Sequence, residues 1–150
     1  GFIGNFFLKK SLKNNFKIID ILREKNRKNK NLKFLRKKYK SSYQSIFFSN
    51  LNQIKSRLKD KKIDYFLNFA TLYKNSHRHS EIPKFINANI IFPTIVLDTI
   101  FPKVKKIINF GTMMQHLDGK NYYPKNFYAS TKSAFEMILT ELYHGVLPFS

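Results

Sequence analysis

Short apolar runs alternate along the chain with longer segments in which apolar residues recur every three or four positions. The short runs are typical of buried strands, and they span residues 16–22, 46–48, 63–70 and 104–110. The longer segments have helical periodicity, and they span residues 5–13, 51–62, 82–101 and 127–143. Strands that alternate with helices at this spacing predict βαβ units. We therefore expect an α/β fold with a doubly wound, mostly parallel sheet and right-handed connections.

Residues that break regular structure mark where several of these elements end. Asn14 and Asn15 follow the first helical segment as its stop signal. Pro93 lies inside the segment at 82–101, and a proline at such a position should kink the helix. Gly145 should end the last helix, and we expect one more strand to begin at residues 146–149.

The composition is that of a chain that folds. With 150 residues there is enough chain for one domain, and 43% hydrophobic content with 16 Phe and 8 Tyr excludes a disordered or collagen-like protein. The absence of Cys excludes a disulfide framework, thiolate catalysis and zinc sites built on Cys, and is compatible with a reducing compartment. No uncharged apolar run is long enough to span a membrane, so we expect a cytoplasmic protein without a membrane partner.

The positive charge is concentrated in the first part of the chain. The formal charge is +19, and residues 1–62 contribute +16 of it, from 19 Lys and Arg against 3 acidic residues. The connection at 23–40 is the most basic part, and we expect it to be helical only in part. A basic excess attracts polyanions. Lys, Asn, Ile and Phe dominate throughout, however, so an AT-rich coding sequence with solvated basic faces is the simpler interpretation.

A glycine pair opens the chain. Gly1-Phe2-Ile3-Gly4 has the spacing of the last two glycines of a dinucleotide-binding turn. In such a turn, one glycine lets the backbone approach the pyrophosphate, and the next lets the helix pack on its strand. An ordinary tight turn explains two glycines at this spacing equally well.

A tyrosine and a lysine stand four residues apart in the last helical segment. Tyr128 and Lys132 share one helix face, so the phenol and the ammonium can reach one small volume. A phenol has an ordinary pKa near about 10, and a neighbouring ammonium lowers that pKa toward the range useful for proton transfer. On spacing alone, a surface pair without function is the more frequent explanation in a lysine-rich chain.

Other candidate motifs carry less weight. His77 and His79 flank Arg78, but two histidines without a third ligand are more often part of a solvated loop, so we expect no metal. The chain contains neither a Gly-x-Ser-x-Gly elbow nor a Walker loop.

Taken in order, these motifs resemble the extended short-chain dehydrogenase/reductase family. The similarity is to its sugar-nucleotide epimerase/dehydratase branch. It rests on Gly1 to Gly4, on the apolar strand that ends in Phe69-Ala70-Thr71, on Phe110-Gly111-Thr112, and on Tyr128-x-x-x-Lys132. The resemblance covers nearly the whole chain and implies a partial NAD(P)-binding, Rossmann-like domain over residues 1–150. Residues 108–116 and 126–136 look closest to deoxysugar enzymes of surface-polysaccharide pathways, such as abequose- and tyvelose-type synthases.

The resemblance assigns the catalytic roles to three side chains. Tyr128 matches the acid/base, and Lys132 matches the residue that lowers the pKa of that tyrosine and holds the nicotinamide ribose. Thr112 follows an expected strand and matches the Ser or Thr that hydrogen-bonds the reacting oxygen. Thr112, Met113 and Tyr128 would contact the substrate.

The resemblance also places the phosphates and adenine of the cofactor. Gly1, Phe2, Ile3 and Gly4 would form the phosphate-binding turn. Asn50-Leu51 falls where the family usually has Asp-Leu against the adenine, so this chain has an uncharged amide at that point.

The nicotinamide half of the cofactor is implied to lie elsewhere. Phe69, Ala70 and Thr71 follow the strand whose end flanks it, and Lys132 would hold the ribose. Asn89 matches an Asn in the next helix that is often structural in this branch.

The choice between NAD and NADP depends on the residue after the second strand of the family. An acid there binds the ribose 2′-hydroxyl, whereas Arg accommodates a 2′-phosphate. Arg23 occupies that position and is followed by Glu24, while Asp20 lies earlier, within the expected strand. We therefore expect NADP or NAD, with NADP favoured.

The implied activity is hydride exchange between the nicotinamide and a carbon of a nucleotide sugar, with Tyr128 moving the hydroxyl proton. The hydride can return to the opposite face (epimerisation), return to another carbon after water loss (dehydration), or stay transferred (oxidation or reduction). The resemblance also implies a homodimer for the full-length protein.

The chain departs from the family pattern at both ends. It begins inside the glycine motif, so the first glycine and the first strand, which is central in the order 3-2-1-4-5-6, are missing. It also stops where the family's second half begins to form the sugar pocket. We therefore expect a piece of a longer enzyme that is inactive or misfolded by itself.

Two alternatives belong to other functional classes. The first is a basic nucleic-acid-binding module, because cations and aromatic residues alternate over residues 23–40. No known nucleic-acid motif is present, so we consider nucleic acid a less well supported partner. The second is a fold that has lost catalysis, against which the intact Thr112, Tyr128 and Lys132 argue.

Overall fold

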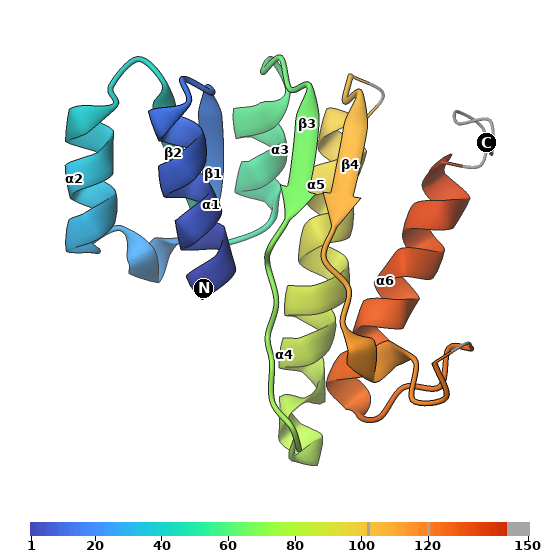
Figure 1. The fold of residues 1–150 in the computed structure, drawn as a ribbon. Coiled ribbons are helices and arrows are strands. Elements are labelled where there is room, and N and C mark those ends of the chain that lie inside the picture. Colours follow the sequence, from blue (N-terminus) through green and yellow to red (C-terminus); the bar gives the residue numbers. More distant parts are fainter. Residues whose placement is uncertain (102, 120, 144–150) are drawn as a thin grey trace. The chain divides into compact units, whose positions relative to one another are not determined.

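The computed structural model describes residues 1–101, 103–119 and 121–143, in which the chain forms two compact units (Figure 1). The first unit comprises residues 1–61 and the second begins at residue 62. The strand expected at 146–149 and the helix end expected at Gly145 lie outside the described residues.

The first unit is built from three helices and two strands. Its elements are α1 (Phe2–Lys13), β1 (Ile18–Arg23), a 3₁₀ turn (Glu24–Asn26), α2 (Lys30–Lys38), β2 (Tyr43–Phe48) and α3 (Asn52–Leu58). The two strands are parallel, with Ile18 opposite Tyr43 and Arg23 opposite Phe48. The basic connection is therefore partly helical, as predicted, because α2 lies within it.

Local sequence signals explain where these helices begin and end. Asn14 caps the end of α1, and Asn15 follows it with a positive φ of 62°, a conformation that Asn tolerates better than most residues. Asn29 precedes α2, and its side-chain oxygen accepts a hydrogen bond from the backbone N–H of Leu32 at 3.2 Å.

Helices α1 and α2 bury their apolar stripes in one common core. The buried members of this core are Leu8, Leu12, Leu32, Leu35 and Tyr43. The residue pairs from each helix are three or four positions apart, the spacing of one helix face. Helix α3 buries a similar pair, Ile54 and Leu58.

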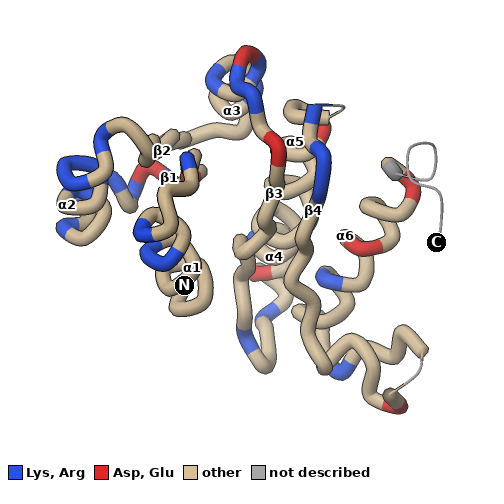
Figure 2. Tube along the Cα trace, turned by 45° about the horizontal axis from the view of Figure 1, so that its top comes forward, with Lys and Arg blue, Asp and Glu red and all other residues tan. Residues whose placement is uncertain are grey.

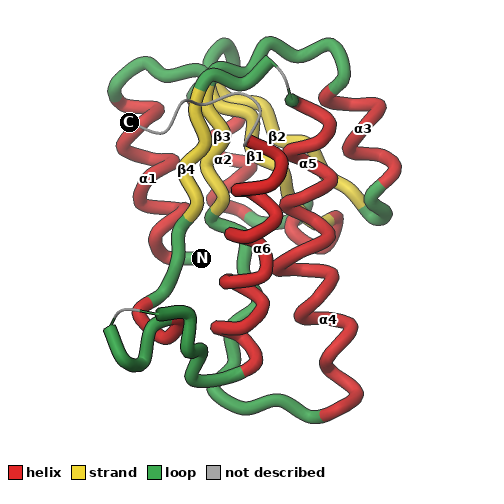
Figure 3. Tube along the Cα trace, turned by 90° about the vertical axis from the view of Figure 1, so that its right-hand side faces the viewer, coloured by secondary structure: helices red, strands yellow, loops and turns green. Residues whose placement is uncertain are grey.

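The second unit has two parallel strands, followed by helices of different types. Its elements are β3 (Tyr65–Asn68), a 3₁₀ turn (His79–Glu81), α4 (Ile82–Ile86), a π-helical segment (Asn87–Ile91), α5 (Phe92–Ile100), β4 (Lys106–Asn109), a 3₁₀ turn (Met113–Gln115) and α6 (Phe127–Tyr143). Tyr65 lies opposite Lys106 in the sheet, and Asn68 lies opposite Asn109. Figure 3 shows α5 and α6 lying alongside the strands of this unit.

The irregularity expected at Pro93 takes the form of a π-helical turn just before it. The backbone N–H of Phe92 donates to the carbonyl of Asn87, five residues earlier. Pro93 has no N–H to offer and occupies the first turn of α5, where none is needed. The helical segment therefore passes through the proline by widening one turn.

Parallel pairing confirms the predicted α/β class, although two strands are shorter than expected. Among the described residues, β1 pairs with β2 and β3 pairs with β4. Strand β3 stops at Asn68 rather than at Ala70, because the side-chain oxygen of Asn68 accepts the N–H of Ala70 at 3.2 Å and turns the chain. Strand β4 begins at Lys106, after Lys105 and Lys106 both donate their N–H to the carbonyl of Asp64.

The basic side chains follow the helices of the first unit. Figure 2 shows Lys and Arg concentrated along α1 and α2, with few acidic residues between them. No helix in the described part of the chain is long and apolar enough to cross a membrane.

Candidate functional site

The carboxyl ends of β3 and β4 are joined side by side in the second unit. Asn68 is buried, and its side-chain NH₂ donates to the side-chain oxygen of Asn109 at 2.9 Å. The next side chains, Phe69 and Phe110, stack with ring centroids 4.4 Å apart. The two loops that leave the sheet here thus start from a fixed position, at the edge where ligands of open parallel sheets bind.

The loop after β4 presents Thr112 and Met113. The N–H of Thr112 donates to the side-chain oxygen of Gln115 at 2.7 Å, and its hydroxyl caps the short turn that follows. Thr112 is half-buried, whereas 92% of Met113 is exposed. The threonine predicted to bind the reacting oxygen is therefore held through its own backbone.

Helix α6 carries both members of the predicted proton-transfer pair. Asn126 precedes this helix, and its side-chain oxygen accepts the N–H of Ala129 at 2.9 Å. Tyr128 and Lys132 are only 9% and 2% exposed, so they do not form a surface pair. The ring of Tyr73 meets that of Tyr128 edge-on at 5.0 Å.

The ammonium of Lys132 is set apart by its surroundings. Burial lowers its pKa from the ordinary value, and the negative charge of Glu136 acts in the opposite direction. Among the residues that the structure describes, this ammonium forms no hydrogen bond or ion pair. Burying a charged side chain is costly, and charged groups with perturbed pKa values are common at functional sites.

A set of polar residues that the sequence reasoning missed is hydrogen-bonded to the same helix, one turn after Lys132. Glu136 receives hydrogen bonds from Asn109, Gln115 and Tyr122. Of these, only Glu136 had a local signal, because it lies four residues after Lys132 on the same helix face. The others come from segments far away in the chain and cannot be found from spacing.

Asn89 is a buried structural residue, in agreement with its expected role. Its side-chain oxygen accepts the N–H of Leu72 at 2.6 Å, and its NH₂ donates to the carbonyl of Leu72 at 3.1 Å. The same NH₂ donates to the hydroxyl of Thr131 on α6 at 2.9 Å. Asn89 therefore ties the loop after Thr71, itself exposed, to the helix that carries Tyr128.

The predicted phosphate-binding turn lies in the first unit. Gly1 precedes α1, and its carbonyl accepts the N–H of Asn5 at 3.1 Å. The N–H groups of Phe2, Ile3 and Gly4 lie in the first turn, where an α-helix offers them no carbonyl. N–H groups of this kind at the N-terminus of a helix can bind an anion.

The other cofactor residues of the first unit lie at the ends of its strands. Arg23 is the last residue of β1 and is exposed, whereas Glu24 is paired with Arg27. Asn50 follows β2, and its side-chain oxygen accepts the N–H of Gln53 at 3.3 Å, next to the half-buried Leu51. Asn50 therefore helps to begin α3 and keeps its NH₂ group for another partner.

The predicted site residues are thus divided between the units. The phosphate and adenine residues, together with Arg23, belong to the first. Phe69, Ala70, Thr71, Thr112, Met113, Tyr128 and Lys132 belong to the second. Within the second unit, Gln115 and Glu136 connect Thr112 to the helix of Tyr128 and Lys132.

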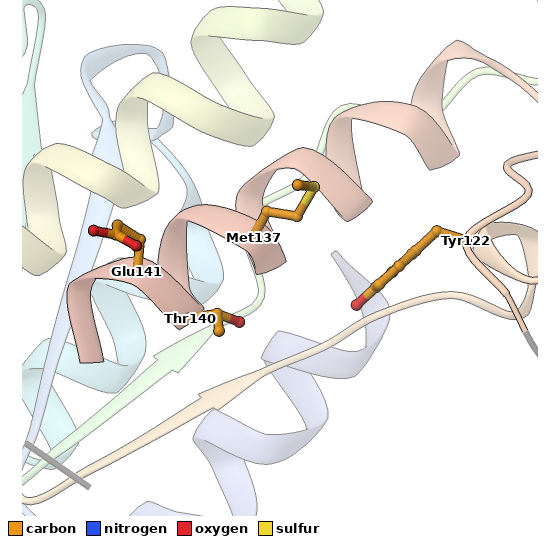
Figure 4. A pocket seen from close by; sticks show the side chains of 4 residues that line it. All are labelled: Tyr122, Met137, Thr140 and Glu141. Atoms are coloured by element: carbon orange, nitrogen blue, oxygen red, sulfur yellow. The ribbon is translucent and has the colours of Figure 1, made fainter. Parts of the chain in front are cut away.

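Two small hollows lie away from these residues. One, of about 190 Å³, is lined by Tyr122, Met137, Thr140 and Glu141, beside the outer face of α6 (Figure 4). The other, of about 290 Å³, lies between α1 and α2.

The histidine pair does not form a metal centre. The ring of His77 stacks on that of Phe127, with centroids 4.5 Å apart. Over residues 1–101, 103–119 and 121–143, no group of three or more His, Cys, Asp or Glu could hold a metal ion.

Known structures share this fold at low sequence identity, while no curated protein matches the chain. A protein of Burkholderia multivorans described as a short-chain alcohol dehydrogenase superposes with a TM-score of 0.77 and 15% identity, covering 95% of this chain and 71% of that one. A short-chain dehydrogenase/reductase of the same organism, with bound NADP, gives a TM-score of 0.74 and 15% identity over 95% of this chain and 68% of that one. Pen from Bacillus thuringiensis gives 0.74 and 19% identity over 97% of this chain and 43% of that one.

A family-level match covers most of the sequence. The sequence profile of the NAD dependent epimerase/dehydratase family matches residues 1–145. This span includes the glycine turn, the strand ends and the Tyr-x-x-x-Lys pair described above. The chain belongs to the NAD dependent epimerase/dehydratase family.

Proposed function

We propose that the chain is the cofactor-binding part of an enzyme that transforms a nucleotide sugar by epimerisation, dehydration or reduction. The observation that carries the proposal is the buried side chain of Lys132, one helical turn from the buried Tyr128, with its ammonium in no hydrogen bond or ion pair among the described residues. Membership of the family supports a nicotinamide cofactor. The similarity of residues 108–116 and 126–136 to deoxysugar enzymes supports a role in surface-polysaccharide synthesis.

The residues present fit such a cofactor. The first turn of α1 would offer its N–H groups to a pyrophosphate, as the positive end of a helix favours anions. Asn50 and Leu51 would contact the adenine, and the unpartnered Lys132 would donate to a ribose hydroxyl. When bound, the cofactor supplies the hydride at C4 of its nicotinamide ring.

The chain's own residues would move and hold the proton. Tyr128 would take the proton of a sugar hydroxyl while that carbon is oxidised and return it when the carbon is reduced. Lys132 would favour the phenolate of Tyr128 by its positive charge. Thr112, held by Gln115, would donate its hydroxyl to the reacting oxygen.

We propose NADP rather than NAD as the cofactor. Arg23 is exposed at the end of β1, where it can meet a ribose 2′-phosphate. Glu24, the acid best placed to bind a free 2′-hydroxyl, is already occupied by Arg27, whose Nη2 donates to its carboxylate at 3.0 Å.

The test uses protein expressed from the complete gene, with NADPH and NADH titrated by fluorescence and turnover measured on a panel of nucleoside diphosphate sugars. Tyr128→Phe should lower turnover by about 10²- to 10⁴-fold, the usual contribution of an acid/base, and leave cofactor affinity nearly unchanged. Tyr123→Phe is the matched control, because Tyr123 is exposed. Equal turnover in wild type and Tyr128→Phe would remove Tyr128 from the mechanism.

A second candidate function is nucleic-acid binding by the basic part of the first unit. The hollow between α1 and α2 is lined by Lys9, Lys13 and Lys38 together with Phe34 and Tyr39. The ammonium of Lys38 lies 5.9 Å from the ring centroid of Phe34, which is largely exposed. Cations beside exposed rings can contact phosphates and stack bases. A salt-dependent DNA mobility assay distinguishes the two, because DNA binding without cofactor binding would overturn the enzyme proposal.

A further inference from the structure

Glu136 receives hydrogen bonds from three separate segments of the second unit. The side-chain NH₂ of Asn109, at the end of β4, donates to one carboxylate oxygen at 3.2 Å. The NH₂ of Gln115 and the hydroxyl of Tyr122 donate to the other oxygen at 2.7 and 3.1 Å. Glu136 itself lies on α6, one turn after Lys132. We propose that Glu136 is a positioning residue, whose carboxylate holds the loop of Thr112 against the helix of Tyr128 and Lys132.

The connection to Thr112 passes through a single buried amide. Gln115 is 1% exposed, its NH₂ donates to Glu136, and its oxygen accepts the N–H of Thr112 at 2.7 Å. Rotating this amide by 180° would place its NH₂ against the N–H of Thr112. Both ends of the Gln115 side chain are therefore fixed, and the position of Thr112 depends on the acceptor that Glu136 provides.

A second arm reaches Glu136 from the end of β3. The N–H of Ala70 donates to the side-chain oxygen of Asn68 at 3.2 Å, and the NH₂ of Asn68 donates to Asn109 at 2.9 Å. Asn109 in turn donates to Glu136. The loop that begins at Phe69 and the loop that contains Thr112 are thus both connected to α6 at this carboxylate.

The direction of the hydrogen bonds explains why the residue must be an acid. In both arms every donor points toward Glu136, so the two arms converge on a group that accepts at both of its oxygens. A carboxylate does so, whereas the amide of Gln has one acceptor and one NH₂ donor. In either orientation, Gln at position 136 would turn a donor toward Asn109 or toward Gln115. One buried donor would then lose its acceptor, which costs more than a hydrogen bond exposed to water.

Gly111 allows the loop to approach this centre. A Cβ at Gly111 would lie 3.0 Å from the side-chain oxygen of Gln115 and 3.0 Å from one carboxylate oxygen of Glu136. Contacts this short are tighter than nine in ten real Cβ contacts, so a larger residue would require both side chains to move by a few tenths of an ångström. The residue directly before Thr112 is therefore restricted by the same carboxylate.

A catalytic role for this positioning rests on the proposed function, whereas the experiment that tests the positioning does not need a cofactor or a substrate. Amide hydrogen exchange is measured by NMR on the cofactor-free protein expressed from the complete gene. Glu136→Gln should speed exchange at the Thr112 amide about tenfold or more, because its acceptor Gln115 is released. Glu141→Gln is the matched control, since Glu141 is on the same helix and exposed, and should leave this amide unchanged.

A paired substitution separates positioning from a general loss of packing. In Gln115→Glu with Glu136→Gln, the acid moves to position 115, where it accepts both the N–H of Thr112 and the NH₂ of residue 136. Donors and acceptors match again, so exchange at Thr112 should return to within about twofold of wild type. Gly111→Ala should speed exchange at Thr112 in the same way as Glu136→Gln, and it carries the test if Glu136→Gln does not fold.

The outcomes of this test and of the functional test are distinguishable. Fast exchange at Thr112 in Glu136→Gln, restored in the double variant, supports the positioning role even if NADPH fails to bind and the proposed function falls. Unchanged exchange in both Glu136→Gln and Gly111→Ala overturns the positioning role, whatever Tyr128→Phe does to turnover. Fast exchange that the double variant does not restore also overturns it, because a packing defect then explains the change.

Discussion

Asn89 offers the sharpest test of how the second unit is held together. It is 1% exposed and lies in the π-helical segment, where its side chain bonds both backbone groups of Leu72 and the hydroxyl of Thr131. Asn89→Ala removes these three hydrogen bonds at once, together with a longer one that the hydroxyl of Thr71 donates at 3.5 Å. The loop at Leu72 would then lose its connection to α6.

The size of the effect follows from what each partner retains. A hydrogen bond of this kind is worth about 1 kcal/mol net, so three give about 3 kcal/mol. Thr131 keeps a second bond, to the carbonyl of Tyr128 at 2.7 Å, and Leu72 is only half-buried, so water recovers part of the loss. We therefore expect Asn89→Ala to destabilise the second unit by about 2 to 3 kcal/mol.

Hydrogen exchange followed by mass spectrometry measures this change for one unit at a time. In peptides from 127–142, Asn89→Ala should speed exchange of the slowest amides by about 30- to 150-fold, the equivalent of 2 to 3 kcal/mol. The control is Asn87→Ala, because Asn87 is exposed, lies in the same segment and donates its side-chain NH₂ to the carbonyl of Pro83 at 2.8 Å, within its own helix. If both variants exchange within about twofold of wild type, the argument from these hydrogen bonds is refuted.

Three further predictions concern charged groups. Burial raises the pKa of Asp20, a hydrogen bond from Tyr43 opposes this, and the folded state therefore binds the proton more tightly than the unfolded chain. This contribution to stability is present below the ordinary pKa of Asp and is lost as pH rises through the raised value. The free energy of unfolding of Asp20→Asn, measured with urea, should therefore rise relative to wild type between pH 4 and pH 7. A difference that stays constant with pH would contradict this. Arg23→Ala should weaken NADPH binding about tenfold or more and NADH binding little in fluorescence titrations, and equal losses would count against a 2′-phosphate contact. Glu136→Gln should lower the pKa of Lys132 further, because burial then acts without the opposing charge; an unchanged pKa in ¹⁵N NMR titration of the ammonium would exclude this coupling.

The helices were predictable because their signals are local. The apolar spacing from Phe127 to Tyr143 predicted α6, which begins at Phe127 as expected. Asn14 and Asn15 marked the end of α1, where a change of backbone conformation is needed. Periodicity and capping depend on residues within one or two turns of each other, so a single sequence contains them.

The strand ends were less predictable because distant residues decide them. The apolar run at 63–70 contained no sign that Asn68 would turn back to bond the N–H of Ala70. That side chain is oriented by Asn109, 41 residues later, to which it also donates. A run of apolar residues indicates that a strand is present, but its length depends on the pairing partner and on where buried polar groups find acceptors.

By itself the sequence determined that Tyr128 and Lys132 share a helix face, that Thr112 follows a strand, and which family the motifs resemble. Only the tertiary structure decided that Lys132 is buried and that Gln115 and Asn109 both donate to Glu136. The reason is physical. Helical spacing determines which neighbours along the chain meet, whereas the pairing of a buried donor with an acceptor depends on how β3, β4 and α6 pack, and these come from distant parts of the chain.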